Sequence, residues 1–277
     1  MKPSAKQSDR GILKAEAGKQ NFSLARYEPT QTLAQLVEYY WVVQWDLRGQ
    51  APYRQVVLSY PSVHMAFEKE HHGMFAGVYG VPSEPYTRHL QETGVVVGVK
   101  FQPGGFYPFW KQPISSITGR ILSVGDIFGE DGTALQHEIF ELDDAEKGVQ
   151  LVERFLLERL PAPDDNVALL NRIVQTVIDN REITKVEDVV SLLGINKRTL
   201  QRLFSRYVGV SPKWVIKRYR LQEAAELIEK GELADWSALS QQLGYYDQAH
   251  FIKDFKAIVG RAPMEYVKDA GGAGQQR

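Results

Sequence analysis

The sequence predicts an α+β protein, with a β-rich N-terminal domain followed by an all-helical C-terminal domain. Aromatic and β-branched runs, punctuated by Gly and Pro, fill the chain up to about residue 126. After residue 166, apolar residues recur at the spacing of amphipathic helices. Between these regions the segment "PAPDDN" places two prolines before polar residues, which cannot continue a helix and so mark a domain boundary.

These observations divide the 277-residue chain, which is long enough for two domains, into five parts. We expect a disordered N-terminus over 1–20, a β-rich domain ending in a helix over 21–160, a linker over 161–166, a helical domain over 167–268 and a disordered tail over 269–277.

Composition excludes several classes of protein. The chain has no cysteine, so disulfides, thiolate metal sites and cysteine nucleophiles are absent, which fits a reducing compartment. No apolar run approaches the roughly 20 residues that cross a bilayer, and the polar start "MKPSAKQSDRG" has no signal-peptide core. The sequence therefore predicts a soluble cytoplasmic protein.

The sequence of the first domain predicts mostly strands. "EYYWVVQW" and "GVVVGVKF" are rich in aromatic and β-branched residues, and "SVHMAFEK" alternates apolar and polar positions. "QPGGF" predicts a tight turn into a short helix. The last element is a helix from about Asp143 to Leu160, in which Asp143 and Glu146 form a start like a capping box.

The segment "TKVEDVVSLLGINKRTLQRLFSRY" predicts two helices joined by a tight turn. Thr184 and Glu187 form a capping box for the first, and Gly194 supplies the left-handed residue that ends it. Asn196 is a good N-cap for the second helix. Helix, glycine turn and helix together are the helix-turn-helix arrangement.

Polar and basic side chains occupy the open face of this second helix. Long donors and a bidentate amide are the types that contact base edges and phosphates in a DNA major groove. Residues 196–220 hold eight Lys or Arg and no Asp or Glu. A solvated basic face is the alternative, although such a face commonly includes acids for i,i+4 ion pairs. The predicted contacts are Lys197, Arg198, Gln201, Arg202, Ser205 and Arg206.

A second unit, "ADWSALSQQLGYYDQAHFIKDFKAIVG", repeats the plan with a turn at Gly244 and an N-cap at Asp247. Its open face is less basic, so we expect weaker phosphate binding and more dependence on shape and apolar contact. The predicted contacts are Gln248, Ala249, Ile252 and Lys253.

A helix starting at Ser211 and Pro212 lies between the two units. Some 18 residues at about 1.5 Å each make a rod of roughly 27 Å, which suits two recognition helices about one DNA turn apart.

Charge supports a polyanionic partner for this part of the chain. Residues 181–268 hold 15 Lys and Arg against 11 Asp and Glu, a net charge of +4 that leaves −5 for the rest.

Residues 167–268 resemble the DNA-binding domain of the AraC/XylS family of bacterial transcription regulators. The motifs are "LGINKRTLQRLFSRYVGVSPKWVIKRYRLQEAAELI" and "GYYDQAHFIKDFKAIVGRAPMEYV". The resemblance implies recognition helices at about 196–207 and 247–257 that enter successive major grooves. Ala249 and Ile252 stand where members of the family often carry polar side chains, so the second helix is expected to read less sequence.

The resemblance also implies an N-terminal sensing or dimerising domain, often a cupin-like barrel. "EYYW" and "GVKFQPGGFYPFW" in residues 24–142 are similar to a regulatory domain found ahead of such modules. The many aromatics allow a pocket for a small apolar or planar ligand, against the alternative of ordinary core packing. The candidate ligand-binding residues are Trp41, Trp45, Phe67, Phe101, Phe106 and Trp110.

A metal site is the other candidate in this domain. His64, His71 and His72 stand near Glu68 and Glu70, but adjacent strand residues point to opposite faces, which favours a hairpin turn with exposed histidines. We expect no metal and no cofactor.

The sequence thus predicts a sequence-specific DNA-binding transcription regulator that is not an enzyme. The alternative, a metal-dependent or other enzyme that uses the helical module for targeting, lacks any recognisable catalytic motif. Double-stranded DNA is the expected partner, and a small-molecule effector, RNA polymerase and a second copy of the chain are further candidates.

Overall fold

The computed structural model describes residues 18, 20–58, 60–82, 86–230 and 236–271. The disorder expected for 1–20 and 269–277 falls mainly outside these residues, although the final helix extends to Gly271 and makes 269–271 helical. Within the described residues, no helix combines the length and apolar character needed to cross a membrane.

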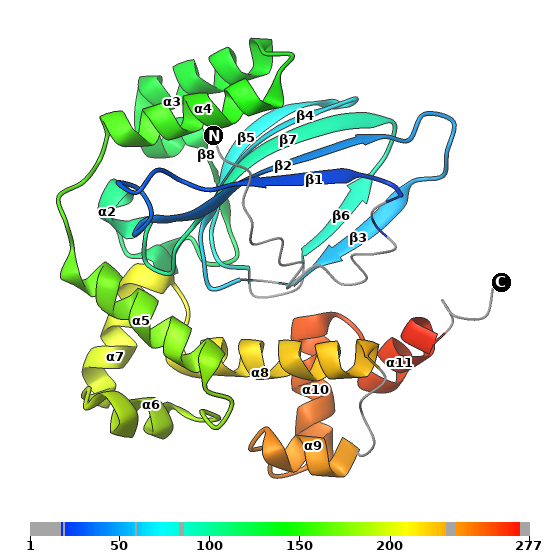
Figure 1. Ribbon diagram of the computed structural model, residues 1–277, viewed down its shortest axis with the longest axis vertical. Coiled ribbons are helices and arrows are strands. Elements are labelled where there is room, and N and C mark those ends of the chain that lie inside the picture. Colours follow the sequence, from blue (N-terminus) through cyan, green and yellow to red (C-terminus); the bar gives the residue numbers. More distant parts are fainter. Residues whose placement is uncertain (1–17, 19, 59, 83–85, 231–235, 272–277) are drawn as a thin grey trace.

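The N-terminal region contains a six-stranded antiparallel sheet in the order β1-β2-β7-β4-β5-β8. Two further strands, β3 and β6, pair with each other and lie across from this sheet (Figure 1). The bounds of the strands are β1 Ser23–Tyr27, β2 Val37–Asp46, β3 Tyr53–Val57, β4 His64–Glu70, β5 Gly73–Tyr79, β6 Tyr86–Leu90, β7 Thr93–Phe101 and β8 Ile121–Ser123.

Two helices cover one face of the large sheet, α3 (Val124–Glu141) and α4 (Ala145–Glu158) (Figure 1). The sequence predicted only the second, because three glycines interrupt the apolar pattern of α3. The cap of α4 also differs from the expectation: Asp144, not Asp143, accepts hydrogen bonds from the backbone of its first turn.

The described residues of the C-terminal region form helices joined by turns, without strands, as predicted. Two short elements belong to the N-terminal region and lie between β7 and β8. They are the helix α2 (Tyr107–Trp110), which follows the turn at 102–106, and the 3-10 turn η1 (Ile114–Ser116). The helices that follow α4 are α5 Asp165–Asp179, α6 Val186–Leu193, α7 Lys197–Leu203, the π-helical segment η2 Phe204–Val208, α8 Pro212–Glu229, α9 Trp236–Gln242, α10 Gln248–Val259 and α11 Pro263–Gly271.

The fold class is therefore the predicted one, a β-rich N-terminal region followed by helices. The hydrophobic core does not follow the same division. One cluster runs from the sheet through α3 and α4 into α5–α7 and the start of α8. A second cluster joins the rest of α8 to α9–α11 and includes Leu58, which follows β3 in the N-terminal region.

Candidate nucleic-acid interface and effector cavity

A left-handed glycine and a capped helix start form the turn between α6 and α7. Gly194 adopts a left-handed conformation with a φ of 65°, which glycine tolerates best. Asn196 Oδ1 then accepts hydrogen bonds from the backbone nitrogens of Arg198 at 2.9 Å and Thr199 at 3.4 Å. Both features confirm the predicted turn and cap.

The start of α6 differs from the prediction. Asp188 Oδ2 accepts from the backbone nitrogens of Thr184 and Lys185, each at 3.0 Å. Glu187, the predicted capping partner, instead pairs with Lys197 across the turn at 2.6 Å. One of the predicted DNA contacts therefore already has an acidic neighbour at the surface.

All six predicted contacts on the first unit are exposed and lie on the outer face of α7 or just beyond it. Arg198, Gln201 and Arg202 make no side-chain hydrogen bond or ion pair with any described residue. The buried face of the helix holds Leu200 and Leu203. The six exposed residues are Lys197, Arg198, Gln201, Arg202, Ser205 and Arg206.

Arg206 is held differently, although it is also exposed. Its Nε donates to the Tyr107 hydroxyl at 2.6 Å, and its guanidinium lies 5.0 Å from the centre of that ring. The rings of Tyr107 and Tyr207 are 4.1 Å apart. In this structure Arg206 therefore joins η2 to the N-terminal region.

The basic stretch 196–220 is only partly a surface feature. Arg218 and Arg220 on α8 are buried, at 0% and 2% exposed. Arg220 pairs with Glu223 at 2.7 Å, and Lys217 pairs with Asp254 of α10. Sequence reasoning missed this because α8 packs on nearly all sides, which a helix of ordinary amphipathic composition does not do.

The second predicted recognition helix, α10, also has a capped start and a buried face. Asp247 Oδ1 accepts from the backbone nitrogen of His250 at 2.7 Å, which confirms the predicted cap. Phe251 and Phe255 are fully buried beneath it. All four predicted contacts are exposed: Gln248, Ala249, Ile252 and Lys253.

Tyr246 adds a side chain that the sequence analysis did not single out. It is fully exposed and directly precedes the cap of α10. The signal was present in "GYYDQ", where the first tyrosine packs on Phe251 and the second has no place in the core.

Helices α7 and α10 lie toward opposite ends of α8, the predicted rod (Figure 1). The 18 residues of α8 span about 27 Å. That length is close to the pitch of B-DNA, about 34 Å, by which recognition helices in successive major grooves are separated.

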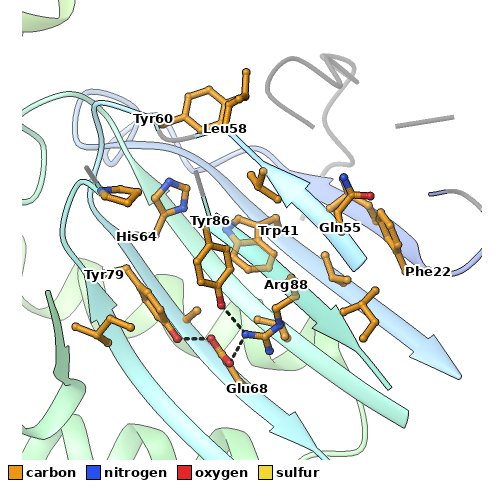
Figure 2. A pocket seen from close by; sticks show the side chains of 18 of the residues that line it. Phe22, Trp41, Gln55, Leu58, Tyr60, His64, Glu68, Tyr79, Tyr86 and Arg88 are labelled. Atoms are coloured by element: carbon orange, nitrogen blue, oxygen red, sulfur yellow. Dashed lines mark hydrogen bonds and ion pairs between the residues drawn. The ribbon is translucent and has the colours of Figure 1, made fainter. Parts of the chain in front are cut away.

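The N-terminal region contains a cavity of about 490 Å³. It lies between the β3–β6 pair and the face of the large sheet opposite α3 and α4 (Figure 2). Alternate side chains of β2 and β4 line it, because successive residues of a strand point to opposite faces. Among them are Tyr39, Trp41, Trp45, His64 and Glu68.

The candidate ligand-binding residues divide between the two faces of the sheet. Trp41 and Trp45 line the cavity. The other four lie outside it, in or against the core that packs under α3 and α4: Phe67, Phe101, Phe106 and Trp110. Strand parity puts Phe67 on the helix-covered face, since His64, Ala66 and Glu68 face the cavity.

Glu68 organises one end of the cavity (Figure 2). It accepts a hydrogen bond from the Tyr79 hydroxyl and another from Arg88 Nη1 at 2.6 Å. Arg88 also pairs with Glu70. Burial and the neighbouring Glu68 carboxylate raise the pKa of Tyr79, so its hydroxyl stays protonated and donates.

His64 stands toward the other end. Burial lowers the pKa of His64 to about 3, and the nearby Lys100 ammonium acts in the same direction. Its imidazole is therefore neutral near pH 7.

Tyr60 connects this end of the cavity to α8. Lys100 Nζ lies 3.6 Å from the centre of the Tyr60 ring, and the Arg218 guanidinium carbon lies 4.5 Å from it. Cations over an aromatic face are attracted by its quadrupole. A cavity-lining side chain is thus in direct contact with the helix that joins the two helix-turn-helix units.

The histidines of the β4–β5 hairpin do not gather into a metal site. His71 and His72 are exposed at the turn, as the hairpin interpretation predicted. Over the described part of the chain, no three His, Asp or Glu side chains come together as a metal-binding group.

Two family models match separate parts of the chain. Residues 25–123 match a family described as a domain of unknown function (DUF6597). Residues 189–269 match a family described as a helix-turn-helix domain.

Curated relatives match part of the chain. An uncharacterised HTH-type transcriptional regulator of Haemophilus influenzae is 29% identical over 43% of this chain and 38% of its own length. The lactose operon transcription activator of Staphylococcus xylosus is 32% identical over 36% of this chain and 37% of its own. The chain thus spans about two fifths of the length of these relatives.

Among solved structures, ToxT from Vibrio cholerae O395 aligns over 91% of this chain and 99% of its own, at 15% identity and a TM-score of 0.38. The identification of the helix-turn-helix domain depends instead on the family match and on the geometry of the region. A glycine turn precedes each capped helix, and a long helix lies between the two units. Residues 189–269 match a helix-turn-helix domain, in agreement with the helix-turn-helix units that the sequence motifs predicted, and relatives of this region include an HTH-type transcriptional regulator.

Proposed function

We propose that this protein is a sequence-specific DNA-binding transcription regulator, in which α7 and α10 enter successive major grooves of one duplex. The observation that carries the proposal is the pair of exposed, N-capped helices at the two ends of α8. Arg198, Gln201 and Arg202 are free of protein partners among the described residues, which leaves them available to bases and phosphates.

The test is selection of binding sites from random duplex DNA, followed by titration of the selected site and a scrambled site at several salt concentrations. A regulator keeps a specificity ratio of about a thousandfold or more. Equal affinities with a steep salt dependence would indicate nonspecific polyanion binding and would contradict the proposal.

The proposal includes control by a small molecule. The cavity has the volume of a ligand site, and Tyr60 on its wall is in contact with Arg218 of α8. A ligand that displaces Tyr60 would change the packing of the helix that sets the spacing of α7 and α10. Such a ligand acts only through its different affinities for the two arrangements.

Replacing Tyr60 by leucine tests this link. The variant keeps an apolar cavity wall but loses the aromatic face between Lys100 and Arg218. We expect ligand to bind the variant while its effect on DNA affinity is lost. An undiminished effect would contradict the route through Tyr60.

The enzyme reading is the less favoured candidate. We propose that the protein works by binding alone, at bacterial DNA in the cytoplasm, with RNA polymerase and a second copy of the chain as further partners. The named relatives, which are transcription regulators, support this view. Stoichiometric metal in the purified protein, measured by elemental analysis, would favour the alternative hypothesis of a metal-dependent enzyme.

A further inference from the structure

Two tryptophans that line the cavity lie over two glycines on the neighbouring strand. Trp41 pairs with Gly98 and Trp45 with Gly94 across β2 and β7. A Cβ at Gly98 would lie 2.2 Å from Trp41 Cε2, and one at Gly94 would lie 2.1 Å from Trp45 Cζ2. Each indole therefore lies against the backbone of β7, which only glycine permits.

The two indoles differ in what they leave free. Trp45 is buried, its Nε1 donates to the Gln91 carbonyl at 3.1 Å, and Arg88 lies over its ring. Trp41 is only half-buried, and its Nε1 makes no hydrogen bond with any described residue. Trp41 thus offers the cavity an open aromatic face.

The principal buried charges at the two ends of the cavity are compensated within the protein. Arg88 lies between Glu68 and Glu70. Lys100 pairs with Glu38 at 2.9 Å.

Of the other lining arginines, Arg120 is exposed to solvent and Arg26 lies over the Tyr39 ring at 5.5 Å. A charged ligand buried against Trp41 would therefore lose its hydration without gaining a buried counter-charge that lacks a partner, whereas a neutral ligand would lose less.

His64 supplies a polar contact. Its side chain lines the cavity and makes no hydrogen bond with any described residue (Figure 2). A neutral imidazole has one donor and one acceptor nitrogen, so it can bind a hydroxyl or a carbonyl.

We infer that the cavity binds a neutral, planar aromatic molecule, which stacks on Trp41 and forms a hydrogen bond with His64 through a hydroxyl or carbonyl group. The volume of about 490 Å³ lies within the range of sites for drug-sized ligands. That this ligand controls DNA binding rests on the proposed function, but its binding does not.

Five probes of similar size test the inference by calorimetric titration of the full chain: 2-naphthol, naphthalene, decahydro-2-naphthol, 2-naphthoate and 2-naphthylmethylammonium. We expect 2-naphthol to bind about fivefold more tightly than naphthalene, which lacks the hydrogen bond, and than the non-planar alcohol. Both ions should bind at least about tenfold more weakly. Tighter binding of either ion, equal binding of the non-planar alcohol, or no binding by any probe would overturn the inference.

Variants assign the contacts. His64→Phe should remove the preference for 2-naphthol over naphthalene while naphthalene still binds. Trp41→Leu should remove the preference for planar rings. Trp110→Leu is the matched control, since this tryptophan lies outside the cavity and should leave all five affinities unchanged. A thermal melt of each variant shows that it is folded, and an unchanged preference in folded His64→Phe or Trp41→Leu would contradict that contact.

The two proposals fail separately. If the protein binds its selected DNA specifically but the cavity prefers ions or the non-planar alcohol, the proposed function stands and the inferred ligand class is wrong. Binding of 2-naphthol without any specific DNA site would do the reverse.

Discussion

At the scale of single residues, two arginines four positions apart have different surroundings. Arg202 is exposed and its side chain makes no hydrogen bond or ion pair with the described residues, whereas Arg206 donates a hydrogen bond to Tyr107 of the N-terminal region. Arg202→Ala should weaken binding to the selected site by about 1–3 kcal/mol if it contacts a base. DNA affinity is measured by fluorescence anisotropy. Arg154→Ala is the control, because that side chain is exposed on α4. An unchanged affinity in Arg202→Ala would count against the assignment of α7.

His64 gives a prediction on pH. The pKa of His64 is lowered to about 3 by burial, whereas the unfolded chain has the ordinary value of about 6.5. Between these values the unfolded state binds the extra proton, so the free energy of unfolding falls as pH falls, by up to about 1.4 kcal/mol per pH unit. Urea unfolding from pH 7 to pH 4 should show a shallower decline for His64→Gln. Identical pH profiles would mean that His64 is not held neutral.

At the scale of elements, α10 presents an apolar strip where α7 presents donors. Ala249 and Ile252 are exposed on its outer face. Apolar side chains in a major groove contact the methyl group of thymine. Replacing thymine by deoxyuracil in the half-site of α10 should weaken binding about fourfold per contacted methyl group.

This experiment has two controls, one in the DNA and one in the protein. The same replacement in the half-site of α7 should have no effect, and Ile252→Ser should lose the sensitivity in the half-site of α10. A dependence on thymine methyl groups confined to the half-site of α7 would reverse the assignment.

Local signals predicted the helical elements well. Asn196, Asp247 and the two turn glycines act within a few residues of themselves, so the sequence alone identifies them. Burial of Arg218 and the division of the aromatics between two faces depend on strand pairing and on packing of distant segments. A single sequence does not determine these, and the cavity residues Tyr60 and His64 were missed as ligand contacts for that reason.

At the scale of the whole molecule, the two helix-turn-helix units belong to different cores. The first shares a core with the sheet, and the second packs on the latter part of α8 and on Leu58 of the N-terminal region. Phe255→Ala should cost about 3–5 kcal/mol within the second core and should raise hydrogen exchange in α9–α11. Protection in α5–α7 should stay near that of the unmodified protein. Equal loss of protection in both sets would show that they unfold as one unit.

The most direct test of the account is a hydroxyl-radical footprint of the full chain on its selected site. One chain should protect two patches about one helical turn apart on the same face of the duplex. Arg202→Ala should weaken protection in one patch and Lys253→Ala in the other. A single patch, or two patches on opposite faces, would contradict the placement of α7 and α10 in successive major grooves.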